Sequence, residues 1–186
     1  MGPMRPNTLK SLAREDEPDF DWSTVSMSIL KRSSFTLLTI LLGCSIPNNA
    51  GEGLRTSPDL LHLEREVHQL INEHRISQNL PPLTMNETIT KEARNHSRAM
   101  AKRKIPFGHH GFVKRVQRIA RALPYSLAAE NVAYNRGYAY CAGNAVEGWL
   151  RSSRHRKNIS GNYRFTGIGV AKDPYGGYYF TQIFWQ

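Results

Sequence analysis

Hydrophobic positions in the second half of the chain repeat first at helical spacing. Between residues 60 and 79, leucine, valine and isoleucine recur every three or four positions, which is typical of an amphipathic helix. A second stripe of this kind joins Ile89 to Met100, and Asn86 can cap the helix that carries it. We expect two shorter helices, one over residues 112–123 and one that begins at a cap on Asn144.

The spacing then changes to that of strands. Residues 128–134 read as extended, and residues 166–171 and 178–185 flank a turn sequence at 173–177, as in a β-hairpin. The last of these segments is apolar on both faces, and a strand of that kind is normally covered on both sides. The pattern therefore predicts an α+β fold of three layers, with helices on either face of a small sheet.

The first 44 residues differ from the rest of the chain in their hydrophobic pattern. Residues 1–26 are polar with no sustained apolar period, and we interpret them as a non-native or disordered extension upstream of the true start at Met27. Residues 27–44 combine a short basic stretch, an apolar run and a small residue, which is typical of a secretory signal peptide. The run is too short to span a bilayer, and a buried strand or short helix is the alternative. Residues 45–59 then form a linker to a domain over 60–186.

The signal-like segment ends in Leu-Leu-Gly-Cys, which resembles the cleavage box of bacterial lipoproteins. In such proteins the cysteine becomes the lipidated first residue, so the resemblance implies a lipid anchor on Cys44. We therefore expect a protein that is secreted or held in the cell envelope, with membrane contact only through that anchor.

Charge is distributed unevenly. Of the 25 basic and 15 acidic residues, five of each lie within residues 1–44, so the whole net charge of +10 belongs to the remainder. Residues 93–129 contain nine Lys or Arg and no acid. Such a block favours an anionic envelope partner, a lipid or an acidic glycan, although a solvated helix face explains it as well. Specific nucleic-acid binding is not expected, because no recognised motif accompanies the charge.

Other features narrow the function further. Two cysteines exclude a disulfide-dense scaffold and a Cys-rich zinc module, and Cys141 reads as a small buried hydrophobe. Tyr134, Tyr138 and Tyr140 surround a glycine-containing loop, where aromatic side chains favour glycan or lipid contact or simply pack the loop. The pattern does not define an oligomeric state.

Four acid or imidazole side chains lie among apolar or small residues: His109, Glu130, Glu147 and His155. A carboxylate in such surroundings is costly unless paired, and imidazoles are natural partners as ion pairs or as co-ligands of a metal. Taken singly, each also has an ordinary structural explanation. Asn131 and Ser152 are candidates to support these groups by hydrogen bonds, or to cap and form turns.

Several segments together are similar to the CAP superfamily, which contains the cysteine-rich secretory, antigen 5 and pathogenesis-related 1 proteins and the SCP-like extracellular domain. The segments are FGHHGF at 107–112, AENVAYN at 129–135, AVEGWLRSSRHRKNI at 145–159, FTGIGVA at 165–171 and GGYYFTQIFW at 176–185. The resemblance runs from about residue 60 to residue 186. It implies a bacterial-type α-β-α sandwich with a small, mainly antiparallel sheet.

The resemblance also implies roles for the four polar residues. The central cavity of the family carries two His and two Glu, which correspond here to His109, His155, Glu130 and Glu147, with the adjacent His110 as the alternative to His109. In some members the two imidazoles bind a divalent metal such as zinc. Arg154 stands where many relatives have glycine, and it adds positive charge beside that cavity.

Three functions are compatible with this reading. The first, which we favour, is a binding module whose cavity holds a divalent metal or small ligand and whose basic face meets the envelope. The second is a metal-dependent, peptidase-like hydrolase with Glu130 or Glu147 as general base, although HExxH and nucleophile-elbow motifs are missing from the sequence. The third is a metal-free structural envelope protein in which the four residues form a buried network.

Overall fold

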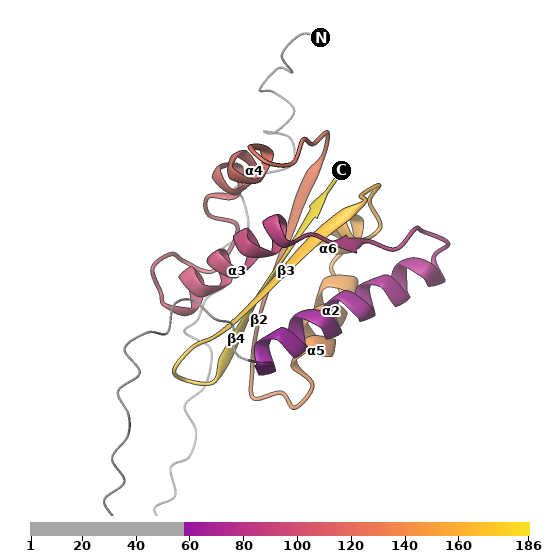
Figure 1. The fold of residues 1–186 in the computed structure, drawn as a ribbon. Helices are drawn as coiled ribbons and strands as arrows, with labels where there is room; N and C mark the ends of the chain where they lie inside the picture. Colours follow the sequence, from indigo (N-terminus) through magenta and orange to yellow (C-terminus); the bar gives the residue numbers. More distant parts are fainter. Residues whose placement is uncertain (1–57) are drawn as a thin grey trace, which may run out of the picture. The chain divides into compact units, whose positions relative to one another are not determined.

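The structure of the protein is a computed structural model that describes residues 58–186 (Figure 1). The predictions for residues 1–26 and 27–44, including lipidation of Cys44, and most of the 45–59 linker lie outside this range. None of the helices formed by residues 58–186 has the length and apolar character needed to cross a bilayer.

Helices and strands follow the order that the sequence pattern predicts, with two additions. The elements are α2 (Pro58–Ser77), β1 (Thr84–Met85), α3 (Glu87–Ala101), α4 (Phe112–Ala120), β2 (Ala128–Arg136), α5 (Cys141–Arg151), α6 (Ser153–Ile159), β3 (Phe165–Lys172) and β4 (Gly177–Trp185). The two-residue strand β1 and the short helix α6 were not predicted, because neither segment is long enough to display a hydrophobic period.

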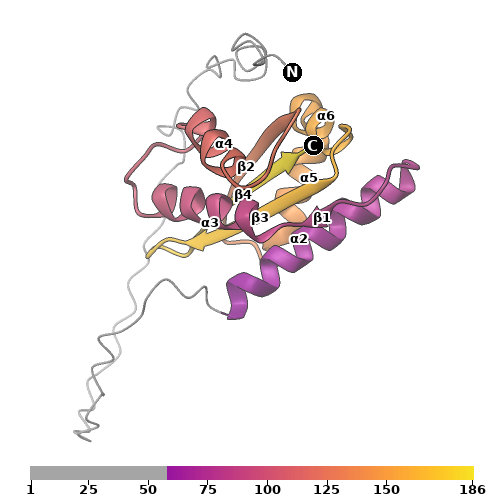
Figure 2. The same cartoon turned by 45° about the horizontal axis from the view of Figure 1, so that its top comes forward.

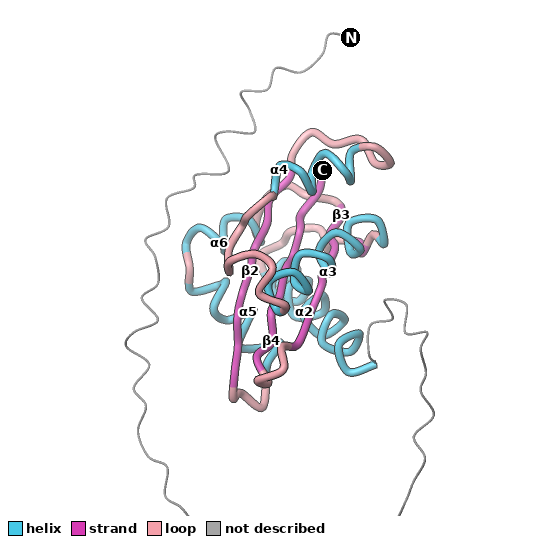
Figure 3. The backbone as a smooth tube through the Cα atoms, turned by 90° about the vertical axis from the view of Figure 1, so that its left-hand side faces the viewer, coloured by secondary structure: helices cyan, strands magenta, loops and turns pink. Residues whose placement is uncertain are grey.

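The sheet has the strand order β1-β3-β4-β2, so β4 lies between β3 and β2 (Figure 3). The short β1 runs parallel to β3, whereas β3 and β2 both pair antiparallel with β4. The expected α+β fold with a small, mainly antiparallel sheet is therefore confirmed.

Two separate cores make the three layers (Figures 1 and 2). Alternate residues of β4 point to opposite faces, so Phe180 and Phe184 pack with α2, α5 and α6, whereas Ile183 and Trp185 pack with α3 and α4. Each of these four β4 side chains is completely buried. This explains why the last strand is apolar on both faces.

Of the two predicted helix caps, one is correct and one is wrong. Asn86 caps α3 as predicted, since its Oδ1 accepts from the backbone N–H groups of Thr88 and Ile89. The predicted cap at Asn144 is wrong, because α5 already begins at Cys141. Asn144 lies in the first turn instead, where its side-chain amide donates to the carbonyl of Tyr140 at 2.7 Å.

Candidate functional site

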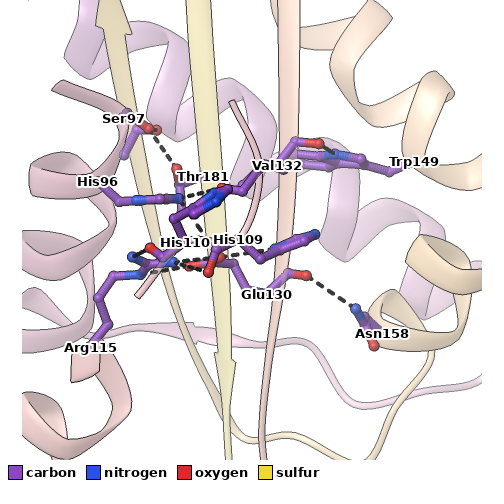
Figure 4. A network of polar contacts seen from close by, with 12 residues as sticks. His96, Ser97, His109, His110, Arg115, Glu130, Val132, Trp149, Asn158 and Thr181 are labelled. Carbon is purple, nitrogen blue, oxygen red and sulfur yellow. Dashed lines mark hydrogen bonds and ion pairs between the residues drawn. The ribbon is translucent and has the colours of Figure 1, made fainter. Parts of the chain in front are cut away.

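The candidate site is built around Glu130 in the middle of β2. Successive side chains of β2 point to opposite faces of the sheet, and Glu130 points to the face that α3 and α4 cover (Figure 4). The side chain is 1% exposed, so its charge requires partners from the protein. We call Glu130, Arg115, His109 and His96 the Glu130 cluster.

Arg115 on α4 is the principal partner of Glu130. Its Nε donates to Oε2 at 2.8 Å and its Nη2 donates to Oε1 at 2.7 Å, which is a bidentate pairing. The same guanidinium donates from Nη1 to the carbonyl of His110 at 2.7 Å and from Nη2 to the carbonyl of His109 at 3.4 Å. One side chain therefore neutralises the buried carboxylate and also holds the backbone of the segment that carries His109.

His109 contacts the same carboxylate from the α3–α4 connection. Its Nδ1 lies 3.0 Å from Glu130 Oε1, and 36% of its side chain is exposed. An ionised carboxylate can only accept, so Nδ1 carries the proton, and the lone pair of a neutral ring is on Nε2. The carboxylate therefore fixes both the tautomer and the orientation of a partly exposed imidazole.

His96 on α3 also contacts the backbone of the α3–α4 connection. Its Nε2 donates to the carbonyl of Gly108 at 2.8 Å and lies 3.9 Å from Glu130 Oε1. Burial lowers the pKa of His96 to about 4, because the attraction of Glu130 for the charged ring is weaker than the desolvation and is opposed by Arg115. His96 is therefore a neutral hydrogen-bond donor at physiological pH.

Glu130 itself stays ionised. Burial by itself raises the pKa of the carboxyl, but the hydrogen bond from His109 and the charge and hydrogen bonds of Arg115 outweigh it, so the net pKa lies below the usual value. A carboxylate that already accepts from three donors and has a lowered pKa is poorly suited to take a proton from water.

His155 approaches the cluster from α6. The centroids of its ring and the His109 ring are 6.4 Å apart. The buried amide of Asn131 on β2 donates to the carbonyl of His155 at 3.2 Å and accepts from Asn158 at 2.9 Å. Asn158 also donates to the carbonyl of Glu130 at 3.3 Å. These contacts fasten the short helix α6 to the strand that carries Glu130.

Glu147 lies outside the cluster, and Ser152 lies at the junction of α5 and α6. Glu147 is on the outer side of α5, where its carboxylate is 62% exposed and lies 3.5 Å from Arg151 one turn away. Ser152 joins α5 to α6 through its backbone, and its side chain makes no capping hydrogen bond. Within residues 58–186, no group of three or more His, Cys, Asp or Glu side chains is arranged to hold a metal ion. The structure thus brings together His109, Glu130 and His155, with Glu147 outside.

Sequence reasoning missed Arg115 and His96, although each had a positional signal. Arg115 shares the buried stripe of α4 with Phe112, Val116 and Ile119. His96 lies three residues after Ala93 on the inner stripe of α3. A charged or imidazole residue on an apolar helical stripe needs a buried partner, and that rule identifies both.

Comparison with known proteins identifies the family and the fold of the chain. The family model described as "CAP: Cysteine-rich secretory protein family" matches residues 68–184, which include every member of the Glu130 cluster. The chain belongs to the CAP family. Two relatives from Bacillus subtilis are similar to this CAP domain: the uncharacterised protein YkwD, 36% identical over 58% of this chain, and the uncharacterised membrane protein YlbC, 32% identical over 65%. The match spans 41% of YkwD and 34% of YlbC, so the chain covers less than half of either relative.

Solved structures have the same fold. An extracellular protein containing an SCP domain from Bacillus anthracis superposes with a TM-score of 0.59 at 26% identity, over 72% of this chain and 45% of that protein. A cysteine-rich secretory protein from Staphylococcus aureus gives a TM-score of 0.57 at 21% identity, over 72% of this chain and 41% of that protein. The CAP fold of residues 58–186 is therefore shared with bacterial SCP-domain proteins.

Proposed function

We propose that this chain is an exported CAP domain that works as a binding module and holds a divalent cation, zinc foremost, between His109 and His155. The observation that carries this proposal is the hydrogen bond between His109 Nδ1 and Glu130, together with the 6.4 Å spacing between the two imidazole rings. A metal-binding histidine usually has its other ring nitrogen bonded to a carboxylate or carbonyl, and His109 has such a partner.

The donor set fits an incomplete site. Two neutral imidazoles suit zinc, and the positions that the protein leaves open would be filled by water or by a group of a ligand. When bound, the cation would act as a Lewis acid towards that group. Glu130 would orient His109, and Asn131 would hold the backbone of His155.

Export rests on the sequence and on one relative. Residues 27–44 predict a signal peptide, with Cys44 as the proposed lipid anchor, and the Bacillus anthracis protein of 26% identity is described as extracellular. The excess of basic over acidic residues is consistent with an anionic partner in the envelope.

The geometry gives little support to a hydrolase. Both oxygens of Glu130 accept hydrogen bonds from Arg115, and Glu147 is exposed and paired with Arg151. A metal-free structural role is the second candidate, because the bidentate Arg115–Glu130 pair already satisfies the buried charge without an ion.

Zinc titration by calorimetry on the purified full chain tests the proposal. We expect one zinc ion per chain, with binding lost in His109→Ala and in His155→Ala. His62→Ala, on the exposed side of α2, is the matched control and should bind as the parent does. A folded parent that binds no zinc, or binding that survives in both site variants, would reject the metal site and leave the structural role.

A further inference from the structure

A row of aromatic side chains lies at the end of the sheet where β3 turns into β4. The ring of Tyr179 on β4 is 4.8 Å from Tyr134 on β2 and 6.4 Å from Phe107 in the α3–α4 connection, measured between centroids. Phe107 is 42% exposed, and Tyr134 and Tyr179 are half-buried. The rings are therefore fixed by one another while part of the row stays accessible.

Tyr175 lies at the tip of the turn that adjoins this row. It is 59% exposed, as much as any large hydrophobic side chain of residues 58–186. Its backbone N–H and that of Gly177 both donate to Asp173 Oδ1 at 2.8 Å, so the backbone of the turn is held by its own hydrogen bonds. An aromatic side chain on a backbone held in this way has less conformational entropy to lose when it binds a partner.

The turn stays in contact with the row because Gly177 lacks a side chain. A Cβ at Gly177 would lie 2.6 Å from the ring of Tyr134, so only glycine allows that ring to pack against the end of the turn. Tyr134, Tyr179 and the turn thus form one continuous surface.

Positive charge adjoins the row. The guanidinium carbon of Arg103 lies 5.0 Å from the centroid of the Tyr175 ring, which joins the end of α3 to the β3–β4 turn. Figures 1 and 2 show these two segments at the same end of the sheet. Lys102 and Lys104 on either side of Arg103 are also exposed.

The segment that carries these cations has no acidic side chain of its own. Residues 93–129 contain no Asp or Glu, and the nearby Asp173 contributes one buried carboxylate that is 7% exposed and bonded within its own turn. Three adjacent exposed cations therefore outnumber that carboxylate, and their field extends over about 10 Å at ordinary salt.

We propose that Phe107, Tyr134, Tyr175, Tyr179 and Arg103 form a binding surface for an acidic polysaccharide. Flat, partly exposed aromatic rings can stack on the C–H faces of sugar rings, while the hydroxyl groups of the three tyrosines hydrogen-bond to sugar oxygens. Arg103, with Lys102 and Lys104, pairs with the carboxylate or phosphate groups that such a polymer repeats along its length. This surface is distinct from the two imidazoles, and binding to it needs no metal.

The composition of the surface favours a glycan over a membrane. A surface that enters the acyl region presents aliphatic side chains such as leucine beside its aromatic ones. The large exposed aliphatic residues of the described chain, Ile76 and Val113, lie on α2 and α4 and not in this row.

Binding of polygalacturonate, a polymer of an acidic sugar, to the full chain in the presence of EDTA tests the proposal. We expect saturable binding that weakens with added salt and is much weaker for the neutral, fully methyl-esterified polymer. Tyr175→Ala and Arg103→Gln should each weaken it by about fivefold or more. Phe107→Ala is a second aromatic variant that leaves the turn intact, and unchanged thermal unfolding verifies that each variant folds.

Two control variants separate this surface from general charge and general apolar exposure. Ile76→Ala removes an apolar side chain of 59% exposure from α2, and Lys157→Gln removes an exposed cation from α6. Both should bind polygalacturonate within about twofold of the parent. Failure of the parent to bind, or equal losses in the controls, would overturn the proposal. Binding to phosphatidylglycerol vesicles but not to the polysaccharide would overturn it in favour of a membrane. Because EDTA removes zinc, these outcomes are independent of the metal site.

Discussion

Arg115 both neutralises the buried carboxylate of the site and holds the backbone beside it. Its guanidinium pairs with Glu130 and also holds the carbonyls of His109 and His110, while His96 holds the carbonyl of Gly108. The backbone that carries His109 is therefore held by two buried side chains that are not themselves candidate ligands, while Glu130 orients the His109 ring.

Breaking this pair should cost far more than breaking an exposed one. Arg115→Met leaves Glu130 buried without its main partner, so we expect the free energy of unfolding to fall by roughly 3–5 kcal/mol. Urea denaturation at neutral pH measures the change. Arg151→Met removes the exposed partner of Glu147 and should cost less than about 1 kcal/mol.

The double variant Arg115→Met/Glu130→Gln makes the reason testable. It removes the uncompensated charge, so it should recover part of the stability that Arg115→Met loses. A single variant as stable as the parent, or a double variant less stable than the single one, would show that the buried charge is not the main cost.

At the scale of elements, helix α3 lies unusually close to strand β3. A Cβ at Gly169 would lie 2.1 Å from the backbone nitrogen of Arg94, and one at Gly167 would lie 2.3 Å from that of Thr90. In both cases the nearest atoms belong to the backbone of α3, so turning a side chain cannot relieve the clash. Ser97 uses this closeness to donate to the carbonyl of Gly169 at 2.8 Å. The glycines thereby set the height of α3, and of His96 on it, above the sheet.

Substituting alanine at two glycines should therefore have opposite effects. Gly169→Ala must push α3 from the sheet, and we expect a loss of at least about 2–3 kcal/mol in the free energy of unfolding. Gly148→Ala on the exposed side of α5 meets no atom within 4 Å and should stabilise the protein by roughly 0.5–1 kcal/mol. Thermal and urea unfolding of the two variants measure the difference, and losses of equal size in both would contradict the close-packing argument.

For the whole molecule, the buried neutral His96 predicts sensitivity to acid. It faces Glu130, Arg115 and His109, and its folded pKa of about 4 lies below the ordinary value of 6.5. Between pH 4 and pH 6.5 the unfolded chain therefore binds more protons at this residue than the folded chain does. The stability that the neutral ring contributes is complete above about pH 6.5 and falls as the pH drops towards 4. Between neutral pH and about pH 4.5, this residue should cost roughly 2–3 kcal/mol.

Urea unfolding at those two pH values measures the loss in the parent, in His96→Gln and in the exposed control His62→Gln. The first variant should lose that much less stability on acidification, because glutamine does not titrate, whereas the control should follow the parent. Equal pH dependence in all three proteins would assign the effect to other groups.

The sequence by itself determined the layers, the long helices and the last two strands. Their hydrophobic periods extend over enough residues to identify them, and the burial of both faces of β4 required helices on each side of the sheet. It also placed His109, Glu130 and His155 among the candidate site residues, since isolated polar groups between apolar neighbours need partners.

Only the tertiary structure decided which partners those residues have. Arg115 is 15 residues from Glu130 in the chain, and no local sequence pattern predicts that α4 directs the Arg115 side chain towards β2. Glu147 looked equivalent to Glu130 in sequence, yet the orientation of α5 leaves it in solvent, because a shift of one position on a helix turns a side chain by about 100°. The same holds for Arg75, whose buried guanidinium reaches the carbonyl of Ile159, 84 residues away. Periodicity reports which face of an element is buried, whereas the choice of partner depends on how separate elements pack, and that is a property of the folded chain alone.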